Sequence, residues 1–215
     1  MWGGLLKSVL LTLLSMAALT APLIMRVNTY PLSKLDYLAI LLLTVWLFNE
    51  FYLPSTPRSN EIKERLSLQI LVILQPGTIF ITAAQYFWLG PTLTLLSTMR
   101  FFGLLMALSG LILRALSMVT LGKRYTMVVS IREGHTIVTR GLYKHIRHPG
   151  YLGMFLFLLG FVLFFSSSWG LIVYMIWGIG QLYRIRIEER VLENFFGNFY
   201  TEYQKRSKRL IPFVY

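Results

Sequence analysis

Apolar residues along the chain gather in six runs that short polar segments separate. The runs cover residues 5–25, 35–53, 68–89, 101–121, 151–165 and 171–183. A helix of about 20 apolar residues is long enough to cross the hydrocarbon core of a bilayer. The first four runs have about this length, and the last two are shorter. This pattern predicts an all-α, polytopic integral membrane protein of about six helices.

The two shorter runs predict a C-terminal helical hairpin, because only residues 166–170 separate them. After Gly180, no proline or glycine interrupts the charged segment Arg184-Ile-Arg-Ile-Glu-Glu189, so the second helix of the hairpin should continue through it. Residues four positions apart lie on one face of a helix. Arg184 and Glu188 should therefore point to the same side of this helix.

Basic residues give the chain a direction in the membrane. The 21 Lys and Arg residues exceed the 9 Asp and Glu residues, for a formal net charge of +12. If all six runs cross, 17 of the 21 basic residues fall on one side, in the N-terminus, the second loop, the 122–150 loop and the tail. The positive-inside rule makes that side cytoplasmic. Topology and anionic lipids then account for the charge, and we expect no nucleic-acid partner. Arg114 lies within the fourth run, without an obvious acidic partner.

The polar segments are too short to form a core of their own. We therefore expect a single membrane domain over residues 1–215, with N-terminal transmembrane helices over 1–120 and a catalytic region over 121–215. The chain has no cysteine, which excludes disulfides, thiolate metal sites and cysteine nucleophiles. His145 and His148 have no third metal-type ligand nearby, so we expect no metal. Dinucleotide-binding and Walker motifs are also absent. Any cofactor must therefore bind in a way specific to this fold.

His148-Pro149 marks the expected start of the fifth helix. Proline disfavours the helical conformation in the residue before it and suits the first helical position. The amides of Gly150, Tyr151 and Leu152 should then be free at a helix N-terminus, where they could bind a carboxylate or a phosphate. His-Pro before a helix more often serves only to begin the helix, and both interpretations stay open.

Glu188 and Glu189 stand at the end of the sixth run, flanked by arginines. They could be a solvated helix end, bind a cationic ligand or act as a base. Ionisable groups are costly to place at the edge of a membrane, which favours a functional site.

Several further elements follow one another in order over about residues 120–215. They are His135-Thr-Ile-Val138, Gly141-x-Tyr143, Arg147-His-Pro-x-Tyr-x-Gly153, Arg184-x-x-x-Glu-Glu189, Phe195-Phe-Gly-x-x-Tyr-x-x-Tyr203 and Ile211-Pro212. In order and spacing they resemble the isoprenylcysteine carboxyl methyltransferase family, whose wider relatives are the phospholipid methyltransferases. Residues 1–120 match only as apolar spans.

The resemblance implies a methyltransferase that uses S-adenosyl-L-methionine and faces the cytoplasm from the cytoplasmic or inner membrane. The cofactor pocket would be formed by the last helical hairpin and a cytoplasmic C-terminal segment. Carried over by position, the residues that would hold this cofactor are His135, Thr136, Ile137, Val138, Tyr143, His148, Pro149, Gly150 and Tyr151. The catalytic residues facing the acceptor would be Arg184, Glu188 and Glu189. The acceptor would be lipophilic and enter from the bilayer.

The acceptor's chemistry decides which residues matter. A carboxylate, as on an isoprenylcysteine, is ionised near pH 7 and needs a fixed cation, which Arg184 offers as a two-pronged donor. An amine, as on phosphatidylethanolamine, needs a proton acceptor such as Glu188. The carboxylate is our leading interpretation; the phospholipid amine, a small thiol or another lipophilic acceptor are alternatives. A non-catalytic membrane scaffold is the alternative from a different class.

Overall fold

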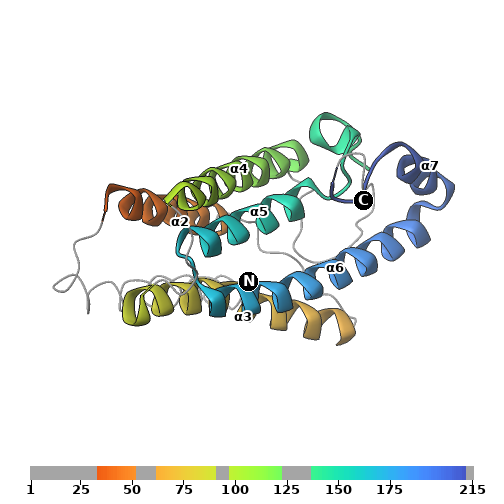
Figure 1. The fold of residues 1–215 in the computed structure, drawn as a ribbon. Coiled ribbons are helices and arrows are strands. Elements are labelled where there is room, and N and C mark those ends of the chain that lie inside the picture. The colour runs from red at the N-terminus through yellow and green to blue at the C-terminus, as the bar shows by residue number, and fades with distance from the viewer. Residues whose placement is uncertain (1–32, 52–61, 91–96, 123–136, 212–215) are drawn as a thin grey trace.

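The computed structural model describes residues 33–51, 62–90, 97–122 and 137–211 (Figure 1). Its elements are α2 (Lys34–Phe51), α3 (Ile62–Leu89), α4 (Ser97–Leu121), the 3-10 helix η2 (Gly141–Lys144), α5 (Pro149–Phe164), α6 (Ser168–Phe196) and α7 (Asn198–Arg206). One isolated parallel bridge joins Ile146 to Lys208. Within the described residues, the predicted all-α fold is confirmed.

Five of the six apolar runs correspond to the helices α2 to α6. The first run lies outside the described residues. The prediction of a continuous last helix is confirmed, because α6 runs for 29 residues and carries the charged segment with it. Helix α7 is an addition that the apolar runs did not predict. It is short and amphipathic, with polar and basic residues among its aromatic side chains.

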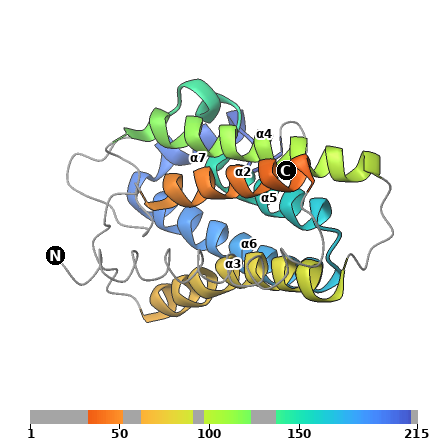
Figure 2. The ribbon, with the colours of Figure 1, turned by 90° about the vertical axis from the view of Figure 1, so that its left-hand side faces the viewer.

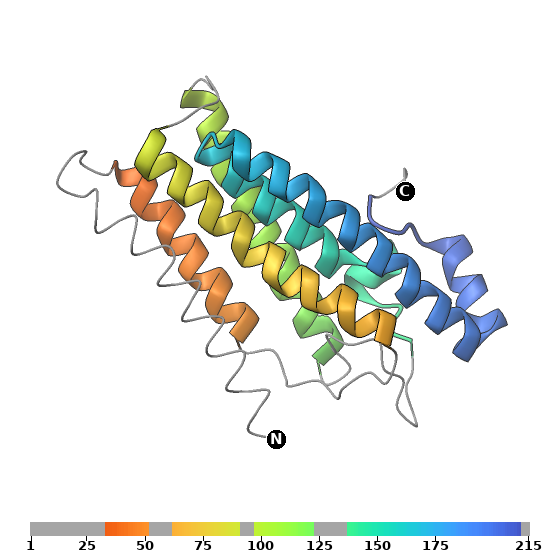
Figure 3. The ribbon, with the colours of Figure 1, turned by 90° about the horizontal axis from the view of Figure 1, so that it is seen from below.

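Helices α2 to α6 lie side by side in an elongated bundle, and α7 folds back at one end of it (Figures 2 and 3). Helices α4 and α5 form its closest pair, and glycines allow this approach. A Cβ atom on Gly160 would lie 2.4 Å from the backbone nitrogen of Ala107, and one on Gly153 would lie 2.7 Å from that of Arg114. Small residues of this kind let two helix backbones approach closely.

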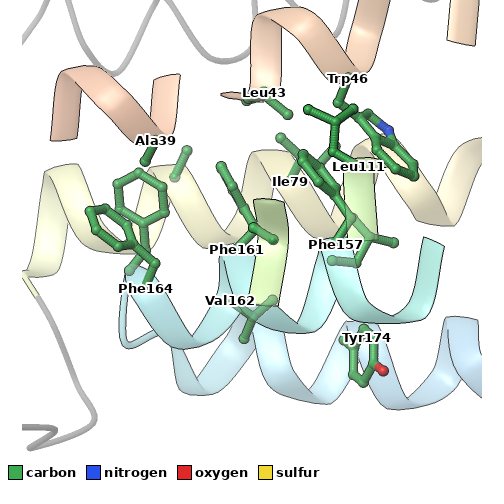
Figure 4. Packing of buried hydrophobic residues seen from close by; sticks show 14 of the residues in the cluster. Ala39, Leu43, Trp46, Ile79, Leu111, Phe157, Phe161, Val162, Phe164 and Tyr174 are labelled. Carbon is green, nitrogen blue, oxygen red and sulfur yellow. The ribbon is translucent and has the colours of Figure 1, made fainter. Parts of the chain in front are cut away.

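The core of the bundle is aromatic and centres on α5 (Figure 4). The side chain of Phe157 is completely buried and stacks on Trp46 of α2, with 4.0 Å between the ring centroids. Phe161 and Val162 continue this core along α5, and Trp177 buries its ring from α6. Helix α5 is therefore held on several sides, which fixes the position of its N-terminus, where the candidate site lies.

Two ion pairs join α2 to α4 near opposite ends of the two helices. The Arg100 Nη2 atom lies 2.7 Å from Asp36 Oδ1, and the Arg114 Nε atom lies 2.9 Å from Glu50 Oε1. Because the N-terminal acid meets the N-terminal base, the two helices run in the same direction. The sequence showed no obvious acid for Arg114. Glu50 is that acid, and the two are 64 positions apart in the chain.

Large apolar side chains cover the outer faces of α4 and α6. Val119 is 79% exposed and Ile179 is 67% exposed, and each belongs to a row of similarly exposed residues on its helix. By length and composition, one helix among the described residues, over Thr98–Leu121, is suited to cross a membrane. Helix α5 is also apolar but shorter.

Candidate active site

Helix α5 begins at Pro149, as the sequence predicted. His148 has a non-helical backbone (φ −124°, ψ 56°), and Pro149 is the first helical residue. The expectation of free amides was wrong for Tyr151 and Leu152, because both donate to the His148 carbonyl at 3.1 Å. That carbonyl closes the first turn of the helix. Anion binding by these amides therefore loses its support, and the side chains around the turn become the candidate site.

Arg114 lies against this turn from the side of α4. Its Nη1 atom donates to the Gly150 carbonyl at 3.4 Å, while Glu50 accepts from both its Nε and Nη2 atoms. A Cβ atom on Gly150 would lie 2.8 Å from the Ser117 hydroxyl oxygen. Gly150 thus packs closely against α4, and the Arg114–Glu50 pair supports the start of α5 from within the bundle.

The chain's C-terminal part returns to the same turn. Gly197, with φ 53°, ends α6 and lets α7 fold back. Beyond α7, a C-terminal strap of residues 207–211 runs beside residues 145–148. The Arg147 amide donates to the Lys208 carbonyl at 2.8 Å, and the Lys208 amide donates to the His145 carbonyl at 2.9 Å. These bonds join the C-terminal strap to the turn before α5 at one end of the bundle, beside the end of α6.

Glu189 is the centre of the charge network that links these segments. Its side chain is 3% exposed. The Arg147 Nε atom lies 2.8 Å from its Oε1 atom, and the Arg209 Nη2 atom lies 2.6 Å from its Oε2 atom. His148 Nε2 is 3.3 Å from Oε1. One carboxylate on α6 therefore holds both the turn before α5 and the C-terminal strap.

Electrostatics explain why this carboxylate stays charged. Glu189 lies beyond the apolar part of α6. Burial alone would raise its pKa, but the hydrogen bonds from His148, Arg209 and Arg147 outweigh burial and lower the pKa to about 2. Arg147 also donates to the carbonyls of Gln204 and Ser207. Glu189 is thus ionised at any physiological pH and fully engaged in binding cations.

Glu188 faces a different neighbour, although it is the adjacent residue. Its Oε2 atom accepts a hydrogen bond of 2.9 Å from the Tyr151 hydroxyl. That hydroxyl also interacts with Arg184, which is buried on the same face of α6. The predicted shared face of Arg184 and Glu188 is confirmed, with Tyr151 between them. The two acids therefore have different roles. Glu188 belongs to a polar group at the start of α5, whereas Glu189 holds the C-terminal strap in place.

Most residues predicted for the site meet here. The structure brings together Tyr143, His148, Pro149, Gly150, Tyr151, Arg184, Glu188 and Glu189. Ile137 and Val138 are half-buried in the irregular segment before η2. His135 and Thr136 lie outside the described residues.

Sequence reasoning gave no site role to four residues that the structure places in this cluster. They are Arg147, Tyr200, Tyr203 and Arg209. Arg209 had counted only toward the topology, Arg147 toward the topology and as the first residue of a motif, and the two tyrosines only as parts of a motif. Arg147 carried a usable signal, since it directly precedes the His148-Pro149 turn.

The described residues thus form a helical bundle with a cluster of charged side chains at one end. The family follows from comparison: residues 103–194 match the model of the isoprenylcysteine carboxyl methyltransferase (ICMT) family. The chain is 36% identical over 117 residues to "Protein-S-isoprenylcysteine O-methyltransferase B" of Arabidopsis thaliana, covering 53% of this chain and 59% of that protein. It is 32% identical over 152 residues to the rat and human proteins named "Protein-S-isoprenylcysteine O-methyltransferase", covering 69% of this chain and 52% of each.

The matches confirm the resemblance that the sequence motifs predicted. Residues 103–194 of the chain are similar to the ICMT family. The matched regions cover little more than half of the length of these relatives. Their names describe methyltransferase enzymes, and the matched segment includes α5, Tyr151, Arg184 and Glu188.

Proposed function

We propose that this protein is an integral membrane methyltransferase that transfers a methyl group from S-adenosyl-L-methionine to a lipophilic acceptor. The proposed acceptor group is a carboxylate on an isoprenylcysteine-like molecule. One observation carries the proposal: the Tyr151 hydroxyl at the start of α5 joins Glu188 and Arg184 of α6. Two motifs that are separated in sequence thereby form one polar group beside the hairpin. The names of the relatives favour a carboxylate over an amine acceptor.

The charges of the cluster fit the proposed cofactor. S-adenosylmethionine carries a carboxylate together with cationic groups, and the cluster offers arginines together with the carboxylate of Glu188. The residues proposed to hold it are the described members of the motif, from Ile137 and Val138 through Tyr143 to His148–Tyr151, with His135 and Thr136 before them. When bound, the cofactor supplies an electrophilic methyl group on a positively charged sulfur.

The protein's own residues would act mainly by positioning. Arg184, buried on α6, would hold the acceptor carboxylate with two parallel hydrogen bonds. Tyr151 and Glu188 would fix the orientation of the Arg184 guanidinium through their shared hydrogen bonds. A carboxylate acceptor has no proton to lose, so no general base is required. Glu189 would act as a positioning residue that keeps the His148 turn in place.

Labelled-methyl transfer in membranes tests the proposed activity. We expect transfer to a prenylcysteine carboxylate and little transfer to phosphatidylethanolamine or to a small thiol. A preference for phosphatidylethanolamine would instead support N-methylation with Glu188 as the base. Failure of the purified, folded protein to bind the demethylated product S-adenosylhomocysteine would contradict the methyltransferase proposal itself.

Arg184→Ala should separate acceptor binding from cofactor binding. Loss of a charge-assisted hydrogen bond costs about 1.5–3 kcal/mol, so transfer should fall about ten- to a hundredfold. Affinity for S-adenosylhomocysteine should stay within a few-fold of wild type. Arg184→Lys should recover little activity, because an ammonium cannot reproduce the two-pronged geometry. Arg186 is exposed on the same helix, and Arg186→Ala is the matched control. Normal turnover by Arg184→Ala would show that the acceptor site lies elsewhere.

We also propose that the chain crosses the membrane six times, with both termini and the 122–150 loop in the cytoplasm. In support, α4 packs against α5 and α3 packs against α6 in opposite directions, as expected when an even-numbered crossing meets an odd-numbered one. Topology reporters fused after positions 60 and 144 should lie in the cytoplasm, and reporters after positions 34 and 91 should lie outside it. Opposite locations for positions 60 and 144 would refute this arrangement.

A further inference from the structure

Tyr200 has a buried hydroxyl group with no hydrogen-bond partner among the described residues. The residue lies in the first turn of α7 and is 1% exposed. Leaving a buried hydroxyl unpaired is costly, and such groups in folded proteins usually serve a purpose. The position of Tyr200 indicates which purpose.

The charges around this hydroxyl belong to the candidate site. The negative charges of Glu189 and Glu188 and the positive charge of Arg147 all act on it. Burial raises its pKa above the ordinary tyrosine value, and the charges of Glu189 and Glu188 raise it further. The phenol therefore stays protonated at physiological pH and remains a hydrogen-bond donor. Among the described residues, no acceptor atom is bonded to this hydroxyl.

Tyr203, one turn further along α7, is a neighbouring tyrosine whose hydroxyl has a hydrogen-bond partner. The two rings form an edge-to-face pair with 6.0 Å between their centroids. The Tyr203 hydroxyl donates to the Tyr143 carbonyl, which ties α7 to η2. Tyr203 therefore has a structural hydrogen bond, whereas the Tyr200 hydroxyl, in a comparable position, has no partner within the described part of the chain.

We propose that the Tyr200 hydroxyl donates a hydrogen bond to the bound methyl donor. The ligand atom would be an oxygen or nitrogen acceptor of S-adenosylmethionine, and the demethylated product would offer the same atom. This inference rests on the proposed methyltransferase function and adds a cofactor-binding residue to it. The resemblance implied a cofactor-binding C-terminal segment, and this inference names the side chain of α7 and the atom that would make the contact.

Tyr200→Phe tests this inference, because it removes only the hydroxyl group. Calorimetric affinity of the full-length protein for S-adenosylhomocysteine should fall about tenfold, the usual effect of one lost hydrogen bond to a ligand. The thermal midpoint without ligand should stay the same or rise, since the variant no longer buries an unpaired hydroxyl. The shift of the midpoint caused by a saturating addition of S-adenosylhomocysteine should become smaller.

Tyr203→Phe is the matched control and should behave in the opposite way. It leaves the Tyr143 carbonyl without its donor, so the midpoint without ligand should fall by about 2–4 °C. If Tyr200→Phe keeps wild-type affinity for S-adenosylhomocysteine, or loses stability as Tyr203→Phe does, the inference is wrong while the proposed function stands. If wild type itself fails to bind S-adenosylhomocysteine, the proposed function fails first.

Discussion

Glu189→Gln is expected to lower the thermal midpoint by about 6–12 °C and to abolish measurable binding of S-adenosylhomocysteine. The substitution keeps the shape of the side chain and removes its charge. Arg147 and Arg209 then stay close together without their shared anion. Breaking a buried pair in this way costs about 3–5 kcal/mol, and we expect about 3 because Arg209 is partly exposed. Scanning calorimetry and ligand titration measure the two effects.

Glu202→Gln is the control for this prediction. Glu202 forms an exposed ion pair with Lys205 on α7, and exposed pairs contribute at most about 1 kcal/mol. Its midpoint should therefore stay close to that of wild type. A Glu189→Gln protein with wild-type stability and ligand affinity would show that the charge network does not hold the site together.

The low pKa of Glu189 adds a pH dependence to the same prediction. A carboxyl whose pKa is about 2 in the folded protein, against an ordinary value of 4.5, stabilises the fold only when it is ionised. This contribution is complete above pH 4.5 and is lost as the pH falls toward 2. The stability difference between wild type and Glu189→Gln should shrink over that range. A difference that is constant with pH would contradict the proposed cause.

Glu50→Gln should destabilise the bundle by about 3–5 kcal/mol, because it leaves the buried Arg114 without its counter-ion. The double variant Glu50→Leu with Arg114→Met should recover most of that stability, since apolar side chains of similar size can replace a buried pair. Denaturation in detergent compares the three proteins. Glu50→Gln should also reduce methyl transfer, because Arg114 contacts the Gly150 carbonyl at the start of α5.

The ion pair between Arg100 and Asp36 offers a control for this result. Arg100 is more exposed than Arg114, with 27% of its side chain accessible. Asp36→Asn should therefore cost less stability than Glu50→Gln, and it should leave methyl transfer unchanged because the pair lies at the far end of the bundle. Equal losses at both positions would show that burial of the arginine does not determine the cost.

Helices whose bounds depend on residues close together in the sequence could be predicted from it. The apolar runs indicated α2 to α6, and the absence of proline and glycine indicated the continuation of α6 through Glu189. The start of α5 at Pro149 followed from the effect of proline on the residue before it. The amides of that turn were predicted wrongly, because the His148 carbonyl closes the turn instead of leaving it open.

Contacts between distant segments could not be predicted in the same way. Glu189 is 42 positions from Arg147 and 20 positions from Arg209. Their meeting depends on the fold-back after Gly197, whose positive φ gives no periodic signal. The sequence analysis treated Glu188 and Glu189 together, as two acids at the end of one helix. It could not show that Glu188 meets Tyr151 while Glu189 meets the C-terminal strap.

The two ion pairs between α2 and α4 also set the register in which these helices assemble. Asp36 and Glu50 are 14 positions apart in α2, and Arg100 and Arg114 are 14 positions apart in α4. The equal spacing, about 21 Å along each axis, allows both pairs to form at a single longitudinal offset. Sliding one helix by a turn, about 5.4 Å, would leave four charges unpaired at once. Apolar helix surfaces alone tolerate such slippage, so these charges select one alignment among many and, with it, the height at which Arg114 meets the start of α5.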